Sequence, residues 1–273
     1  MFSQQRNTSA LAASFRFSEL LFHTIVRVVR RTHRNAIVGL ASNIMQTVVL
    51  VAVFYFMFSV LGLRGLAIRG DFLIYLMTGI FLYLTHNKTL GAVLGSEGPA
   101  SSIMKHAPMT TALSIASSAL SVLYLQLLSM FVILFVVHVA FNPIVIDDPA
   151  GVALPFFLAW FSGVAIGILL LAIKPFFPGF TSIVAQIYTR ANMISSGKMF
   201  VANSLSPALV PYFSWNPLFH AIDQARGAAF INYNPHVSSI MYPVYFSLIF
   251  IVIGLMGEFY TRQMASASWD AGR

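Results

Sequence analysis

The chain has 273 residues, of which 58% are hydrophobic and only 9% are charged. Soluble domains carry about 25% charged residues, so this composition excludes a soluble enzyme or binding module and indicates a polytopic membrane protein. The formal net charge of +8 is interpreted as positive charge held on the cytoplasmic side of a membrane rather than as a nucleic-acid surface. There is no cysteine, which excludes disulfides, thiolate metal sites and cysteine nucleophiles.

Residues 15–34 form the clearest amphipathic stretch. At about 100° per residue, its polar side chains fall within one sector and apolar side chains fill the opposite side. Such a helix lies in the membrane interface with its arginines toward phosphate headgroups, either as a simple anchor or as a helix that also docks on a cytoplasmic partner. The polar sector contains Arg16, Glu19, His23, Arg27, Arg30, Arg31 and Arg34.

Six apolar stretches follow, and a span needs roughly 20 residues. The second stretch frays into polar residues at Thr85–Lys88, the fifth is the most polar of the six, and no separate soluble domain fits between them. The predicted fold is therefore one all-α polytopic domain over residues 1–273, with an N-terminal interface helix and short amphipathic outer helices before the last span. The predicted spans cover residues 36–61, 71–93, 110–141, 152–173, 180–202 and 237–256.

Two non-spanning segments stand out. Residues 95–108 form a polar island, in which Pro99 could start a short helix that Pro108 ends. Residues 203–235 contain the second segment, where Asn216 is placed to cap a helix that begins at Pro217. The residues after Pro217 alternate as in a short amphipathic helix, which predicts that it lies on the membrane surface. Its apolar side includes Leu218, Phe219, Ile222, Ala225 and Ala229, and its polar residues are His220, Asp223, Gln224 and Arg226.

The distribution of basic residues predicts the orientation. With the N-terminus inside, eleven Lys and Arg residues lie on the inner side and four on the outer side, with Arg190 left in a span. This asymmetry fits the positive-inside rule and places both termini in the cytoplasm. The inner residues are Arg6, Arg16, Arg27, Arg30, Arg31, Arg34, Lys88, Lys105, Lys174, Arg262 and Arg273, and the outer ones are Arg64, Arg69, Lys198 and Arg226.

Arg190 is the leading functional candidate. A charge at mid-membrane costs about 2.5–3.5 kcal/mol on insertion scales and usually faces a partner or a water-filled cavity. None of the eight acidic residues lies at the centre of a predicted span, so Arg190 either lines a pore or snorkels to the outer interface. Aromatic residues with polar tips are further candidates for the substrate path, although each could equally serve packing. They are Tyr55, Tyr75, Tyr188 and Trp160.

The same scarcity of acids excludes other chemistry. Proton-coupled carriers commonly use intramembrane carboxylates, and metal sites need convergent His, Asp or Glu ligands. No metal site and no catalytic residue is therefore predicted. Ser196-Gly197-Lys198-Met199 lacks the upstream Gly and the final Ser or Thr of a phosphate-binding loop, so no nucleotide or cofactor is expected to bind this chain.

The order of these elements resembles the membrane subunit of type-2 ABC exporters, above all those that export capsular polysaccharide or O-antigen. The most specific motif is Trp215-Asn216-Pro217-Leu218-Phe219-His220 followed by Arg226, and the likeness covers roughly residues 19–262. The resemblance implies a homodimer driven by two separate cytoplasmic ABC ATPase subunits, which bind ATP and Mg, in the bacterial inner membrane. The cargo would be a lipid-linked glycan.

The resemblance also implies roles for particular segments. Residues 95–108 would be a coupling helix, with Glu97, Lys105 and His106 as contacts to the ATPase, and Arg27 and Arg31 of the interface helix would add to them. Residues near 205–212 and 217–230 would form two periplasmic gate helices. The gate candidates are Tyr212, Phe213, Trp215, Asn216, Pro217 and Arg226, the first three also being interpreted as an interfacial aromatic belt.

Three alternatives stay open. The same architecture could export a drug, teichoic acid or another lipid-linked molecule. A multi-span transferase acting on a lipid-linked sugar would need clustered acids or histidines facing one aqueous surface. A purely structural assembly subunit would have no ATPase partner.

Overall fold

The structure, a computed structural model, describes residues 10–32, 36–62, 68, 70–98, 110–141 and 143–270. Helices are the only regular elements within these ranges, as the composition predicts. The α-helices are α1 (Ala10–Thr32), α2 (Ala36–Val60), α3 (Phe72–Leu94), α4 (Thr111–Ala140), α5 (Pro149–Ile173), α6 (Pro178–Ser195), α7 (Val210–Ser214), α8 (Pro217–Ala229) and α9 (Met241–Asp270), and a 3-10 turn, η2, covers Ala202–Ser204.

Within the described residues, four helices are long and apolar enough to cross a membrane, which indicates a helical, membrane-embedded protein. Their crossing stretches are Ile37–Val60, Thr111–Ala140, Pro149–Ile173 and Met241–Met264. Two of the six predicted spans, α3 and α6, are not among these four. Polar residues dilute both, namely His86, Asn87 and Lys88 in α3 and Gln186, Arg190 and Asn192 in α6.

Helix α3 is the centre of the bundle and contacts α2, α4, α5, α6 and α8. Its residues from Ile74 to Leu82 are buried without interruption. The polar run Thr85–Lys88 does not fray the helix, contrary to the expectation, and α3 continues to Leu94. Neighbouring helices supply hydrogen-bond partners to this run, which replaces the water that a polar stretch would otherwise need.

Small residues let α5 approach its neighbours closely. A Cβ added at Gly163 would lie 2.5 Å from the carbonyl oxygen of His86, and one at Gly167 would lie 2.7 Å from the Cβ of Val93. On the other side of α5, a Cβ at Gly254 of α9 would lie 2.9 Å from the backbone nitrogen of Leu169. Close backbone approach at small residues is a common way for helices to associate in membranes.

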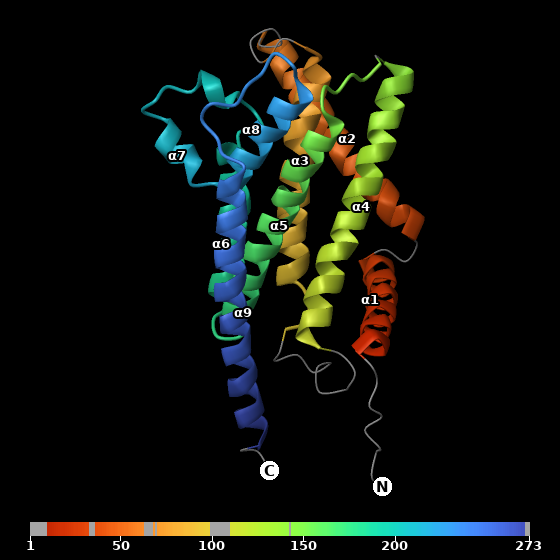
Figure 1. Cartoon of the computed structure of the whole chain (residues 1–273), viewed down its shortest axis with the longest axis vertical. Coiled ribbons are helices and arrows are strands. Elements are labelled where there is room, and N and C mark those ends of the chain that lie inside the picture. The colour runs from red at the N-terminus through yellow and green to blue at the C-terminus, as the bar shows by residue number, and fades with distance from the viewer. Residues whose placement is uncertain are drawn as a thin grey trace.

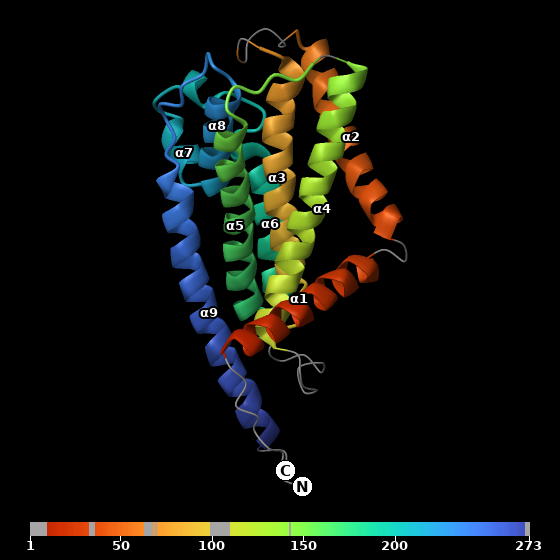
Figure 2. The ribbon, with the colours of Figure 1, turned by 45° about the vertical axis from the view of Figure 1, so that its right-hand side comes forward.

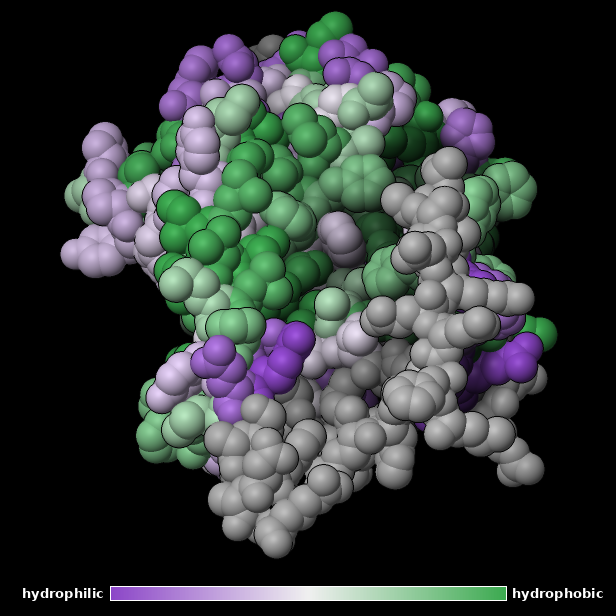
Figure 3. Space-filling view, turned by 60° about the horizontal axis from the view of Figure 1, so that its bottom comes forward, coloured by the Kyte–Doolittle hydropathy of each residue, from purple (hydrophilic) through white to green (hydrophobic). Residues whose placement is uncertain are grey.

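The two ends of the bundle carry different elements. Helices α7 and α8 lie at one end, whereas α1 and the C-terminal part of α9 lie at the other (Figure 1). Helix α1 runs across the lower part of α4 rather than along it (Figure 2). The space-filling view shows a broad hydrophobic area with hydrophilic residues gathered toward its two ends (Figure 3).

Several boundaries differ from the sequence expectations. Helix α6 ends at Ser195 instead of 202, because Gly197 takes a positive φ of 76° and turns the chain away. Helix α5 begins at Pro149 because the side chain of Asp148 accepts a hydrogen bond from the backbone nitrogen of Gly151. Helix α7 is only five residues long, and α9 continues to Asp270, well beyond the predicted end at 256.

Candidate functional site

Helix α8 is buried inside the protein, which corrects the prediction that it lies on the membrane surface. Its start is as predicted, because Asn216 caps it by accepting a hydrogen bond from the backbone nitrogen of Leu218 at 3.0 Å. The apolar side of α8 packs against α3 and α5, but its polar side is also covered, and the side chains of Asp223 and Arg226 are each only 1% exposed. Amphipathicity in this helix therefore reflects contacts with the chain's own polar groups.

Arg226 binds the segment that follows α6. Its guanidinium donates hydrogen bonds to the carbonyl oxygens of Gly197 at 2.8 Å, Lys198 at 2.9 Å and Phe200 at 2.7 Å. The carbon at the centre of the guanidinium also lies 4.1 Å from the centre of the Tyr75 ring on α3. One side chain thereby joins α8, α3 and the turn after α6. The segment 196–199, which only weakly matches a phosphate-binding loop, supplies two of the carbonyl oxygens that Arg226 binds.

His220 and Asp223 bind the connection between α8 and α9. The Nε2 of His220 lies 2.8 Å from the carbonyl oxygen of Ser214, and its Nδ1 accepts a hydrogen bond from the backbone nitrogen of Ser239 at 3.0 Å. Asp223 accepts hydrogen bonds from the hydroxyls of Tyr233 and, at 2.6 Å, Ser238. Burial lowers the pKa of His220, and burial together with the bond to Asp223 raises the pKa of Tyr233.

The gate candidates therefore differ in burial. Asn216, Pro217 and Arg226 are buried, and the amide nitrogen of Asn216 donates to Asn192 of α6 at 2.8 Å. Tyr212 and Trp215, in contrast, are 71% and 45% exposed, in keeping with an interfacial position. Phe213 is half-buried, with its ring 5.0 Å from that of Phe200.

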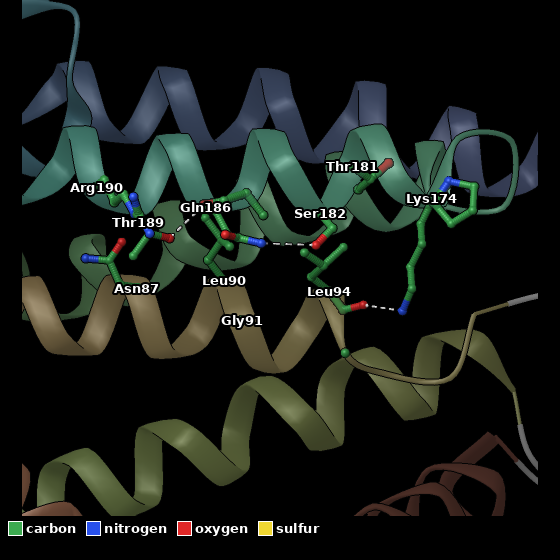
Figure 4. Close-up of a pocket in the computed structure, with 13 residues that line it drawn as sticks. Asn87, Leu90, Gly91, Leu94, Lys174, Thr181, Ser182, Gln186, Thr189 and Arg190 are labelled. Carbon is green, nitrogen blue, oxygen red and sulfur yellow. Dashed lines mark hydrogen bonds between the residues drawn. The ribbon is translucent and has the colours of Figure 1, made fainter.

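A groove of about 500 Å³, lined by both polar and apolar side chains, runs between α3 and α6 (Figure 4). Arg190 lies toward one end, and Lys174, just before α6, lies at the other. From Ser182 to Arg190 the groove follows about 12 Å of helix, at 1.5 Å per residue. Its remaining lining includes Asn87, Leu90, Gly91, Leu94, Gly95, Pro178, Thr181, Ser182, Ala185, Gln186 and Thr189.

The groove sets hydrogen-bond donors and hydroxyls beside a larger apolar surface. Arg190 is exposed and has no hydrogen-bond or ion-pair partner among the residues that the structure describes. Lys174 donates to the carbonyl oxygen of Leu94 at 3.0 Å, and Gln186 donates to Ser182 across one turn at 3.4 Å. Among the described residues, its lining contains two cations and no carboxylate, so it suits an anionic or polyhydroxylated ligand.

Of the five path candidates, only Arg190 lines this groove. Tyr75 is buried beneath Arg226, and the indole nitrogen of Trp160 donates to the carbonyl oxygen of Ala119 at 2.9 Å. The hydroxyl of Tyr188 lies 3.1 Å from Nε2 of His86 inside the bundle. Tyr55 packs against Phe72 and lines a separate apolar cavity between α2, α3 and α4.

Sequence reasoning missed a polar cluster that joins α2, α3 and α4. The amide nitrogen of Asn43 donates to Gln126 at 2.6 Å and to Ser129 at 2.7 Å, and its oxygen accepts a hydrogen bond from Lys88. The Nδ1 of His86 lies 2.9 Å from the hydroxyl of Ser162, which ties α3 to α5 as well. The signal was the polar run at 85–88, which a buried helix tolerates only with internal partners.

The expected ATPase contacts are only partly described. Lys105 and His106 lie outside the described residues, as does most of the predicted coupling segment. Glu97 is half-buried, and its backbone nitrogen donates to the hydroxyl of Ser114 at the start of α4. Arg27 is exposed on α1, and Arg31 lies in the last turn of α1, where its side chain is outside the described part.

Comparison with known proteins finds no family model that matches the chain, and no curated protein matches it either. Among the described residues, no group of three His, Cys, Asp or Glu side chains is placed to hold a metal ion.

Proposed function

We propose that this chain is the membrane subunit of an ATP-driven exporter that moves a lipid-linked polysaccharide, such as a capsule or O-antigen precursor, across the bacterial inner membrane. The groove between α3 and α6 is the observation that carries the proposal. It combines two cations, several hydroxyl and amide groups and an apolar wall from Leu90 and Leu94. Sugars need many hydrogen-bonding groups and a phosphate-containing lipid carrier needs cations, so both chemistries are present along one path.

The position of the groove supports a channel formed by two copies. Helix α6, which lines the groove, leaves Ile183, Ile187 and Ile194 exposed by 58%, 61% and 69%. A second copy facing α6 would cover these apolar side chains and would turn an open groove into a closed passage. The cargo would then slide between two donor-rich walls without meeting lipid.

The proposal assigns energy supply to a partner. Two cytoplasmic ABC ATPase subunits would bind ATP and Mg and would act on residues 95–108 and on Arg27 and Arg31 of α1. Glu97 packs at the start of α4, so a push on this segment would reach the bundle through α4. The termini would both be cytoplasmic, in line with the placement of α1 and the end of α9 at one end of the bundle.

The test is purification of the tagged chain from its native host in mild detergent, with mass spectrometry of what co-purifies. We expect an ATPase with a Walker motif near equal stoichiometry. Recovery of the chain with no ATPase, under conditions that preserve a known ABC complex, would reject the proposal. A variant with residues 99–108 replaced by a Gly-Ser linker should lose the ATPase but should still insert in the membrane.

A further inference from the structure

A cavity of about 630 Å³ lies between α1 and α4. It is apolar except for Arg30 and Tyr124, and it lies apart from the groove between α3 and α6. Helix α1 contributes Phe22, Ile25, Val26, Val29 and Arg30, and α4 contributes Leu120, Leu123, Tyr124 and Leu127.

The expected position of α1 in the membrane interface would place this cavity where lipid headgroups meet acyl chains. Helix α4 is apolar enough to cross the membrane, and α1 runs across its lower part (Figure 2). An amphipathic helix with a basic polar face lies along the membrane plane, with its apolar face about 5–10 Å into the boundary between headgroups and acyl chains. The space beneath α1 is therefore open to lipid.

Charge selects the kind of lipid. The described side chains of α1 include Arg16, Arg27 and Arg30, all exposed, and only one acid, Glu19. Arg30 stands at the border between the polar sector of α1 and the cavity, with Tyr124 on the α4 side. A guanidinium beside an apolar pocket matches a phosphate attached to an acyl chain, because its N–H groups fit phosphate oxygens in pairs.

We infer that this cavity binds one anionic phospholipid, with an acyl chain between α1 and α4 and the phosphate against Arg30. A lipid fits better than a protein partner, because neighbouring side chains of α1 are exposed and strongly apolar. Phe15 and Phe22 are 76% and 63% exposed, which a membrane would cover and cytoplasm would not. A bound lipid would fix α1 against α4 in addition to their direct contacts.

The test places the purified chain in nanodiscs with equal amounts of phosphatidylglycerol and phosphatidylcholine, followed by native mass spectrometry of retained lipid. We expect one phosphatidylglycerol to be retained preferentially. Arg30→Gln should lower that preference about fivefold, the effect of one cation at an anionic surface. Arg16→Gln removes the same charge from the same helix away from the cavity and should leave the retained lipid unchanged.

A second pair of variants tests the cavity itself. Val26→Trp should fill it and abolish retention, whereas Leu20→Trp places the same side chain on α1 outside it and should not. Equal losses for Arg30→Gln and Arg16→Gln would show diffuse attraction to α1 and would overturn the inference, as would full retention by Val26→Trp. A photo-cross-linker at Leu123 that captures a protein rather than lipid, in native membranes, would also overturn it.

Discussion

Arg226 is the residue whose replacement we expect to destabilise the protein most. It is 1% exposed and donates to three carbonyl oxygens while it covers the ring of Tyr75. Hydrogen bonds to charged groups contribute about 1.5–3 kcal/mol each, but burial of the guanidinium and substitute partners in the unfolded state offset part of this. We expect Arg226→Met to lower the free energy of unfolding by about 3–5 kcal/mol.

Arg226→Lys separates charge from geometry. An ammonium keeps the cation near Tyr75, but a single nitrogen cannot replace the two guanidinium nitrogens that reach three carbonyl groups. We expect a loss of about 2–3 kcal/mol, roughly the value of one or two lost charged hydrogen bonds. The assay is denaturant unfolding in mild detergent, followed by tryptophan fluorescence.

Arg190→Met is the matched control, because Arg190 is exposed, and such changes usually stay within about 0.5 kcal/mol. If Arg226→Lys were as stable as the unchanged protein, the geometry of the guanidinium would not matter. If Arg226→Met were no worse than Arg190→Met, the account of α8 as a buried connector would be wrong.

The other predictions concern packing, pH and the groove. Gly163→Ala should lower the free energy of unfolding by about 1–3 kcal/mol, because the added Cβ would meet the carbonyl oxygen of His86. The control Gly91→Ala, where an added Cβ has nothing within 4 Å, should be neutral or slightly stabilising in the same unfolding assay. Asn43→Leu should lower the free energy of unfolding by about 1–3 kcal/mol, because it leaves Lys88 and Gln126 without their hydrogen-bond partner. Adding Lys88→Met to Asn43→Leu should recover part of this loss, and no recovery would argue against coupling between Asn43 and Lys88. Protonation of His220 would place an N–H against the backbone N–H of Ser239, and the pKa of His220 is lowered in the folded state. The stability of the fold should therefore fall as pH drops below about 6.5, the pKa of His in the unfolded chain. His220→Gln should flatten the dependence of melting temperature on pH between about 7.5 and 5.5, and an unchanged slope would contradict this. Arg190→Gln should reduce export several-fold without changing the melting temperature, and normal export would remove Arg190 from the path.

The sequence predicts the start of α8, where Asn216 caps the helix through a side-chain oxygen that accepts a backbone hydrogen bond. Thr110 and Asp148 cap α4 and α5 in the same way, but neither is among the caps predicted from the sequence, and α5 begins at Pro149 instead of 152. Composition and apolar length predict a membrane-embedded helical chain, and four helices confirm this. That the chain has six membrane spans stays a prediction, because α3 and α6 carry polar residues that can lie within a membrane only where neighbouring helices supply partners.

The burial of α8 could not be read from its pattern. A polar side of a short helix faces either water or polar groups of the same chain, and periodicity does not distinguish these cases. Arg226 and Asp223 find their partners at 197–200 and at 233–238, which only the tertiary fold brings together. The same holds for the groove, where Arg190 was a candidate but its neighbours on α3 were not.

The most direct test of the central claim is cargo blockade at α6 by thiol labelling. The chain has no cysteine, so a single introduced cysteine gives no background. We expect a bulky hydrophilic thiol reagent to stop appearance of the exported glycan at the cell surface when it modifies Gln186→Cys in the groove. The reagent should leave export intact at Asp147→Cys, an exposed position in the connection between α4 and α5, and equal effects at both positions would contradict the claim that the groove carries the cargo.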